Sequence, residues 1–302
     1  MISILIPTYN DDCVSLAHTL MRQCSDIPGL EWELIVGDDG SICPQVIETN
    51  RQIDTWPHCR YWLTGVNRGR AAIRNALAKI AKGQWLLMVD ADLKVLHHDY
   101  ISKYVAFIKE STQPCACCGG YQVGRGSISN LRYRYEKSVE KRQSASFRLK
   151  APYQNFKLSN TLIYRTILLE HPLNEHILHY GYEDVMFGIM LKKAGVPVVH
   201  LDNPVLFDRF ESNLSFVEKI EASIEVLTIF RNELKGYSAL LTLVGTSKGY
   251  ILSSILYPVL SFLHSFLKKN LLSCLPSLFA LRLYKLYLLI FQLKRFSRPW
   301  IP

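Results

Sequence analysis

Two aspartates separated by one residue stand at the end of an apolar run. Asp90 and Asp92 follow residues 85–89, which have the length of a strand and contain no polar side chain. Side chains two residues apart in an extended chain point to one face. Two adjacent carboxylates repel each other unless a cation or strong donors offset their charge. The pair therefore predicts a divalent metal site at the end of a buried strand, with a solvated acidic turn as the alternative.

Two other polar segments follow earlier apolar runs. Residues 7–10 come after the first run and residues 37–41 after the second, so both are expected at the carboxyl edge of a sheet, where α/β folds bind ligands. Tyr9 can stack on a base, and the Asp39 carboxylate can accept the N3–H of uracil. Residues 38–41 alone are equally compatible with a tight turn that has an Asx cap.

A basic segment precedes the acidic pair. It begins at Asn67, contains Arg68 and Arg70, and is followed one helical turn later by Arg74. A helix over residues 67–81 is expected to start here. A helix N-terminus with adjacent guanidinium groups favours a diphosphate as its neighbour.

Alternating strands and helices are needed to position these residues, and the hydrophobic pattern predicts them. The expected fold is α/β, with a mixed, mainly parallel sheet, helices on both faces and a helical C-terminal tail. The expected strands are residues 2–6, 33–36, 60–63, 85–89, 115–123, 158–164 and 197–201, the last of which closes the domain. The expected helices are residues 13–24, 67–81, 97–110, 182–194 and 213–234.

The positive charge of the chain is concentrated near its C-terminus. The net charge is +9, yet up to Glu233 there are 26 basic and 26 acidic residues, and beyond it nine basic and no acidic ones. This asymmetry argues against nucleic-acid binding and favours contact between a C-terminal element and an anionic membrane surface. The basic and aromatic segment 132–150 has two interpretations, a mobile anion-binding segment and a solvated charged helix.

Composition indicates a globular chain of the cytosol. Its 302 residues are 49% apolar, which excludes a disordered chain. Eight scattered cysteines favour a reducing compartment, and those at 115–118 are expected to be buried thiols rather than metal ligands. No signal peptide is evident at the N-terminus.

Three apolar stretches occupy the tail. Residues 250–267, 271–283 and 286–296 are separated or interrupted by Lys, Arg and Pro, and each uninterrupted run is shorter than the roughly 20 residues of a spanning helix. Interfacial or re-entrant helices with snorkelling cations are therefore expected. A helical cap on the domain or a dimer interface is the alternative.

In combination, these motifs resemble those of the family 2 glycosyltransferases, inverting enzymes with a GT-A fold. Five segments occur in the order of that family, residues 4–10, 36–41, 67–75, 89–92 and 181–184. The resemblance covers roughly residues 1–233, which would be the catalytic domain. Residues 234–302 would then be a membrane-associating helical segment.

The resemblance implies a role for each candidate residue. The implied donor site contains Pro7, Tyr9, Asp39, Asn67, Arg74 and Asp90. Tyr9 and Asp39 would hold the nucleoside, and Asp90 would touch ribose or metal. Asp92 would ligate Mg²⁺ or Mn²⁺ bridging the diphosphate, and the metal would act as a Lewis acid on the leaving nucleoside diphosphate.

The acceptor side is implied by a second acidic pair. An inverting displacement needs one carboxylate to remove the acceptor hydroxyl proton, and Asp184 is the candidate, with Glu183 second. Acids that complement a helix dipole are the alternative. His200 is a candidate to complete the metal shell, or a structural histidine. Where some bacterial relatives carry a histidine after the Asn-Pro pair, this chain has Asp208, which either substitutes for it or leaves that contact missing.

The sequence therefore predicts inverting transfer of a sugar from a nucleotide-sugar donor, a UDP-sugar, to a glycan or lipid-linked glycan acceptor. The expected setting is cell-surface polysaccharide synthesis at the cytoplasmic face of the membrane. A nucleotidyltransferase is the first alternative, but it predicts a Gly- and Arg-rich phosphate loop after the first strand, which residues 7–10 do not provide. A catalytically inactive membrane scaffold is the second, and it predicts loss of the acidic residues that this chain retains.

Overall fold

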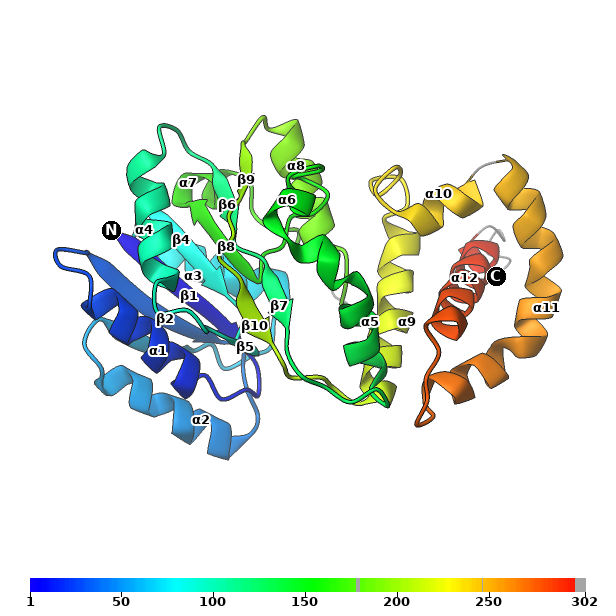
Figure 1. The fold of residues 1–302 in the computed structure, drawn as a ribbon, viewed down its shortest axis with the longest axis horizontal. Helices are drawn as coiled ribbons and strands as arrows, with labels where there is room; N and C mark the ends of the chain where they lie inside the picture. Colours follow the sequence, from blue (N-terminus) through cyan, green and yellow to red (C-terminus); the bar gives the residue numbers. More distant parts are fainter. Residues whose placement is uncertain (178–179, 246, 297–302) are drawn as a thin grey trace. The chain divides into compact units, whose positions relative to one another are not determined.

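Two compact units make up the chain in the computed structural model, which describes residues 1–177, 180–245 and 247–296 (Figure 1). The first unit comprises Met1–Gly124, Glu140–Leu178 and Phe187–Arg209, and the second comprises Arg125–Val139, His179–Met186 and Phe210–Pro302. The boundary expected after residue 233 differs from this division, because the helix α9 (Asn213–Ile229) belongs to the second unit.

A seven-stranded sheet forms the centre of the first unit. In spatial order the strands are β3 (Cys59–Leu63), β2 (Trp32–Asp38), β1 (Ile2–Thr8), β4 (Trp85–Val89), β8 (Asn160–Tyr164), β6 (Ala116–Cys118) and β9 (Val198–His200). Strand β8 is antiparallel to β4 and β6, and the other pairs are parallel. The predicted mixed, mainly parallel sheet is thus confirmed. The strand order reverses between β1 and β4, so a ligand crevice is expected at their carboxyl ends.

A second sheet consists of three short strands, β5 (Leu93–Lys94), β10 (Val205–Phe207) and β7 (Tyr121–Val123). Two sequence predictions are wrong here. Residues 115–123 form two strands instead of one, because Gly119 and Gly120 turn the chain and Gly120 has φ of 81°. Residues 197–201 are not the last strand, because β10 follows them.

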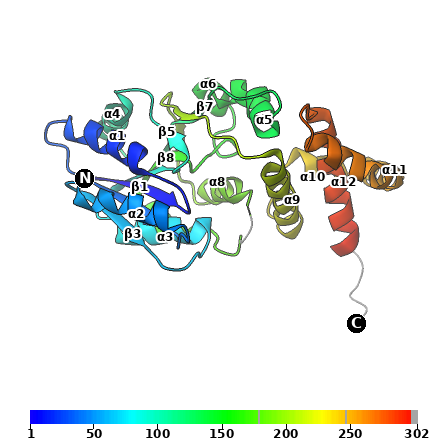
Figure 2. The same cartoon turned by 90° about the horizontal axis from the view of Figure 1, so that it is seen from below.

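Helices cover both faces of the large sheet. Helices α1 (Val14–Ser25) and α4 (Tyr100–Glu110) lie on one face and α3 (Arg70–Ile80) on the other (Figure 2). Every residue of β4 is buried, as expected for a strand without polar residues. The remaining elements of this unit are α2 (Pro44–Arg51), η1 (Gln52–Thr55), η2 (Glu140–Gln143), α6 (Ala145–Arg148), α7 (Arg165–Glu170) and most of α8 (Glu183–Lys193).

The second unit is helical. It contains α5 (Leu131–Val139), α9, α10 (Ala239–Gly245), α11 (Ser247–Leu271) and α12 (Leu278–Phe296). Its core contains Leu131, Phe216, Val217, Ile220, Leu271, Ala280, Leu281 and Tyr284. The first apolar stretch of the tail lies within α11, which continues through Pro258. The second and third stretches are joined in α12, which starts at Leu278 and continues through Lys285. In the part of the chain that the structure describes, no helix has the length and apolar character needed to cross a membrane.

Candidate active site

The turns after β1 and β2 hold each other in place. The backbone N–H of Asn10 donates to Ser41 Oγ (2.6 Å), and Asn10 Oδ1 accepts the N–H of Ile42 (2.9 Å). Asn10 has φ of 52°, a left-handed conformation that asparagine tolerates. Tyr9 precedes this anchored residue and is 45% exposed, whereas Pro7 is buried within β1. The Tyr9 ring is therefore available for stacking at the carboxyl edge of the sheet.

Two adjacent aspartates connect β2 to its surroundings. Asp38 is fully buried and accepts a hydrogen bond from the hydroxyl of Tyr61. Asp39 accepts the backbone N–H groups of Arg68 (2.9 Å) and Gly69 (2.8 Å). Burial raises the pKa of Asp39, and these two amides partly offset the rise. A carboxylate has about four acceptor positions, so Asp39 fixes the start of α3 and can still accept a ligand donor.

A cavity of about 130 Å³ lies beside Asp39. Its walls are formed by Asp39, Trp62, Leu63, Thr64, Arg68, Ala72, Ile73 and Ala76. Pockets for whole drug-sized ligands measure about 300–1,000 Å³, so this cavity has room for one part of a ligand, such as a base. Asn67 is exposed, and its backbone nitrogen would be 2.6 Å from a Cβ at Gly40, where φ is 74°. Only glycine fits that turn.

Arginines of α3 hold the first aspartate of the acidic pair. Arg74 Nη2 lies 2.5 Å from Asp90 Oδ1, and Arg70 Nη2 lies 3.6 Å from Asp90 Oδ2. Burial would raise the pKa of Asp90, but the two arginines outweigh it and hold the pKa below its ordinary value. Arg74 is buried, and its Nε has no partner among the described residues. Asp90 is therefore charged and tethered, and the arginine that holds it retains a donor for an anionic ligand.

The second aspartate is in a different state. Asp92 makes no hydrogen bond or ion pair with any residue that the structure describes. Burial and repulsion from Asp90 raise its pKa, with Asp11 adding to the rise and Arg70 and Arg209 opposing it. A carboxylate in this setting gains more from a bound cation than one already paired with arginine.

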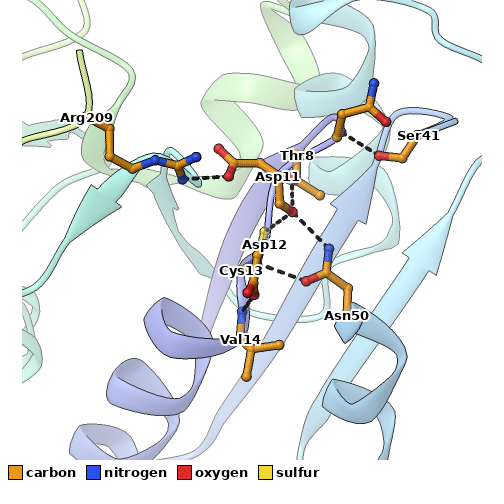
Figure 3. Close-up of polar contacts among 9 residues, drawn as sticks. Thr8, Asp11, Asp12, Cys13, Val14, Ser41, Asn50 and Arg209 are labelled. Carbon is orange, nitrogen blue, oxygen red and sulfur yellow. Dashed lines mark hydrogen bonds and ion pairs between the residues drawn. The ribbon is translucent and has the colours of Figure 1, made fainter. Parts of the chain in front are cut away.

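An ion pair near Asp92 joins two segments of the first unit that are far apart in sequence. Arg209 Nη1 lies 2.5 Å from Asp11 Oδ1 (Figure 3). The backbone carbonyl of Asp11 accepts Thr8 Oγ1 (3.2 Å) and Asn50 Nδ2 (2.9 Å), which fixes the chain at this point. Sequence reasoning missed this pair. The position of Asp11 directly after the β1 turn was the available signal, whereas nothing near Arg209 in the sequence pointed to it.

Strand β10 brings a further carboxylate to this edge. Phe207 pairs with Leu93 in the antiparallel ladder, so the adjacent residues Asp208 and Asp92 reach the same end of it. Asp208 Oδ2 accepts Lys94 Nζ (2.7 Å), while Oδ1 is buried without a partner among the described residues. Among all the residues that the structure describes, no group of three or more His, Cys, Asp or Glu side chains is placed to hold a metal ion. Mg²⁺ usually takes one or two protein carboxylates plus substrate phosphates, so Asp92 and Asp208 fit a cation of that kind.

His200 lies in a different environment, and the structure does not support its predicted role as a metal ligand. Strands β8 and β6 separate β9 from β4, a distance of about 14 Å at the usual strand spacing. His200 Nε2 lies 3.0 Å from the Pro152 carbonyl and Nδ1 2.7 Å from Arg148 Nη1. A guanidinium only donates, so Nδ1 accepts and Nε2–H donates, and neither nitrogen has a lone pair left. Burial lowers the pKa of this buried imidazole to about 4.

Arg148 organises the region around His200. It is buried and donates to the carbonyls of Cys118 (2.8 Å), Gly119 (2.9 Å) and Leu201 (2.9 Å). It therefore fixes the turn between β6 and β7 and is not an anion-binding side chain. The segment 132–150 is mainly helical, in α5, η2 and α6, which agrees better with the helical interpretation of that segment than with the mobile one.

Glu183 and Asp184 begin α8 and belong to the second unit, whereas the residues above belong to the first. Glu183 Oε2 accepts the backbone N–H of Gly181 (3.0 Å). The two preceding residues have positive φ, 118° at Gly181 and 66° at Tyr182. A bulky side chain in that conformation is strained, and such strain is concentrated at functional sites.

Comparison with known proteins decides the family. The model for glycosyl transferase family 2 matches residues 3–169, more than half of the chain. The chain belongs to glycosyl transferase family 2. A relative from Haemophilus influenzae, described as an uncharacterized glycosyltransferase, is 30% identical over 111 residues, which are 37% of this chain. The match spans 43% of that relative's length.

Solved structures support the GT-A fold of this family 2 member. A mannosyltransferase, PcManGT from Pyrobaculum calidifontis, in complex with GDP-Man and Mn²⁺, has a TM-score of 0.60 at 15% identity, covering 98% of this chain and 87% of its own. S. aureus TarS 1-349 has a TM-score of 0.53 at 18% identity, covering 99% and 92%. The same TarS segment in complex with UDP-GlcNAc has a TM-score of 0.52 at 17% identity, covering 99% and 93%. At these identities the likeness concerns the fold.

Proposed function

We propose that this chain transfers a sugar, with inversion, from a nucleotide-sugar donor to a glycan or lipid-linked glycan acceptor. The observation that carries the proposal is the contrast at the carboxyl edge of β4, where Asp90 is held by Arg74 and Arg70 and Asp92 has no partner among the described residues. A metal-dependent site for a nucleotide sugar needs cationic side chains for the phosphates and a carboxylate for the metal. In this chain the arginines that hold Asp90 and the carboxylate of Asp92 lie next to each other.

The nucleoside is assigned to the edge formed by β1, β2 and α3. The exposed Tyr9 ring offers a stacking surface, and Asp39 offers acceptor positions beside a cavity large enough for a base. A uracil ring would satisfy such an acceptor through its N3–H, which favours a UDP-sugar. Arg74 and the N-terminus of α3 would then face the diphosphate, and Asp90 would be free of metal and close to ribose.

Asp92, with Asp208 as the second carboxylate, would hold Mn²⁺ or Mg²⁺. When bound, the ion supplies Lewis-acid stabilisation of the leaving nucleoside diphosphate. The buried Oδ1 of Asp208, which lacks a partner among the described residues, supports the choice of this residue over His200. PcManGT was solved with GDP-Man and Mn²⁺, which supports a nucleotide sugar and a divalent ion as ligands of this chain.

Asp184 is the proposed base, with Glu183 as its neighbour and alternative. The carboxylate of Asp184 takes the proton of the acceptor hydroxyl while that oxygen bonds to the anomeric carbon. The bond from the anomeric carbon to the diphosphate oxygen breaks on the opposite face, and the nucleoside diphosphate leaves. This assignment rests on the order of the family motifs and on the strained backbone at Tyr182.

We infer cell-surface polysaccharide synthesis at the cytoplasmic face of the membrane from the excess of basic residues beyond Glu233. A lipid-linked acceptor would be reached from that position.

Donor hydrolysis across a panel of UDP- and GDP-sugars with Mn²⁺ tests the proposal. We expect release of UDP from one UDP-sugar, and loss of transfer to acceptor in Asp184→Asn with donor binding retained. The control is Glu48→Gln, which alters an exposed ion pair with Arg51. Turnover of no nucleotide sugar, or full transfer by Asp184→Asn and Glu183→Gln alike, would contradict it.

A further inference from the structure

One side of α11 carries large apolar residues that are exposed. Ile255, Val259, Phe262 and Phe266 are 66%, 55%, 76% and 63% exposed. Their spacings of four, three and four residues place them on a single stripe of a helix with 3.6 residues per turn. We call these four residues the α11 face. A contiguous apolar stripe of this kind marks a contact surface, whereas scattered exposed apolar residues do not.

The opposite side of α11 is packed within the second unit. Leu260 and Leu271 are buried, and the rings of His264 and Tyr287 stack with centroids 5.1 Å apart. Lys268 Nζ lies 2.7 Å from Glu221 Oε1. The orientation of the helix is therefore fixed by its own core, and the α11 face is exposed because of that orientation.

Charge indicates the kind of partner. Lys269 lies three residues after Phe266, on the same stripe, and is exposed, whereas Lys268 turns inward to Glu221. Arg282 and Arg295 on α12 are also exposed, and the chain beyond Glu233 has no acidic residue. An apolar stripe that continues into cations matches the acyl and anionic headgroup layers of a lipid surface.

A second copy of the chain fits this surface less well. Pairing of the α11 face with itself about a two-fold axis uses the same patch on both copies. Such pairing brings two basic, acid-free segments together, and like charges across an interface oppose association. The observations therefore favour an anionic bilayer.

We propose that α11 lies in the plane of an anionic phospholipid bilayer, with Phe262 and Phe266 inserted among the acyl chains and Lys269 at the headgroups. The proposal deepens the membrane location proposed above and rests on it, but not on the sugar-transfer activity. It assigns the attachment to one helix face, whereas the charge asymmetry assigned it only to the tail.

Binding of the full chain to vesicles tests the proposal. Large unilamellar vesicles of phosphatidylcholine with phosphatidylglycerol are compared with pure phosphatidylcholine, for wild type, Phe262→Glu/Phe266→Glu and the control Ile128→Glu. Ile128 is 67% exposed but lies outside α11. We expect at least about a tenfold lower vesicle partition coefficient for the double variant, wild-type partition for the control, and weaker binding of all three to the neutral vesicles.

Three further measurements make the result decisive. Equal unfolding temperatures of the double variant and wild type establish that folding is intact; if the double variant unfolds, Phe262→Ser is used in its place. Wild-type partition by a folded variant overturns the proposal, and so does a wild-type dimer, detected by light scattering, that this variant dissociates. Donor hydrolysis without vesicles is expected to be unchanged, so failure of the attachment and failure of the enzymatic function are measured separately.

Discussion

The end of β4 and the end of β9 each present a polar side chain that the sequence assigned to one metal ion, but their surroundings differ. Both nitrogens of His200 are used by Arg148 and Pro152. Asp92 has no partner among the described residues and a raised pKa. His200 is buried and Asp92 is half-buried, but the main difference between them is whether their hydrogen-bonding atoms have partners. The difference indicates that a polar group whose hydrogen bonds are satisfied within the chain stabilises the fold. A polar group without such partners is a better candidate for binding a ligand.

The largest effect on activity is expected at Asp92. Asp92→Asn keeps the shape of the side chain but removes its charge, so we expect transfer to fall about a thousandfold. His200→Gln is expected to leave kcat within a few-fold of wild type once the protein is folded. Initial rates at saturating Mn²⁺ measure both. Equal losses in the two variants would remove the distinction between the two sites.

A variant of Asp90 tests whether a carboxylate that is paired with arginine contributes to stability, although it lies only two residues from Asp92. Asp90→Asn leaves Arg74 buried without its carboxylate, and breaking a buried pair costs about 3 kcal/mol or more. Urea unfolding is expected to record that loss of stability. Asp92→Asn is the matched control and is expected to unfold at the wild-type midpoint or later. An unchanged midpoint for Asp90→Asn would show that the Arg74 contact is dispensable.

The buried imidazole of His200, at the end of β9, predicts a pH dependence of stability. The pKa of His200 is about 4 in the folded protein against 6.5 as its ordinary value. The unfolded chain therefore takes up the proton first, so this contribution to stability is fully present above pH 6.5 and declines as the pH falls toward 4. At about pH 5 the loss is about 2 kcal/mol.

Urea unfolding of wild type and His200→Gln between about pH 7.5 and 5 checks this prediction, because the variant lacks the titrating imidazole. The difference between the two unfolding free energies should shrink at low pH. A constant difference would indicate that the imidazole titrates normally and is not buried as a neutral group.

The smallest effect is expected at Asp208. Its ion pair with Lys94 is partly exposed, so Asp208→Asn should change stability by less than about 1 kcal/mol. Its buried Oδ1 is the atom proposed for the cation, and Mn²⁺ affinity in the presence of UDP should fall several-fold. Lys94→Gln, which leaves both oxygens in place, is the control. If both variants lose affinity equally, the ion pair and not the oxygen is responsible.

The sequence predicted most of the fold because β1, β2 and β4 are uninterrupted apolar runs between helix signals. It failed at Gly119 and Gly120, where a turn moves β7 into another sheet, and at α2, which lacks a strong periodic pattern. At the site, Tyr9, Asp39 and Asp90 lie at the carboxyl ends of their strands, as the sequence predicted. Asp11 and Arg209 meet across 198 positions of sequence, and no local pattern encodes such a contact.

His200 was misassigned for a related reason. A histidine at the end of a strand has the same sequence signature whether its strand adjoins β4 or is separated from it by two other strands. Only the sheet order and the buried partner Arg148 distinguish the two cases.

Calorimetric titration of UDP in the presence and absence of Mn²⁺ tests the central claim most directly. Wild type and His200→Gln should bind UDP more tightly with Mn²⁺, and Asp92→Asn should bind UDP weakly and with the same affinity in both conditions. A Mn²⁺ enhancement that survives in Asp92→Asn but disappears in His200→Gln would contradict the account.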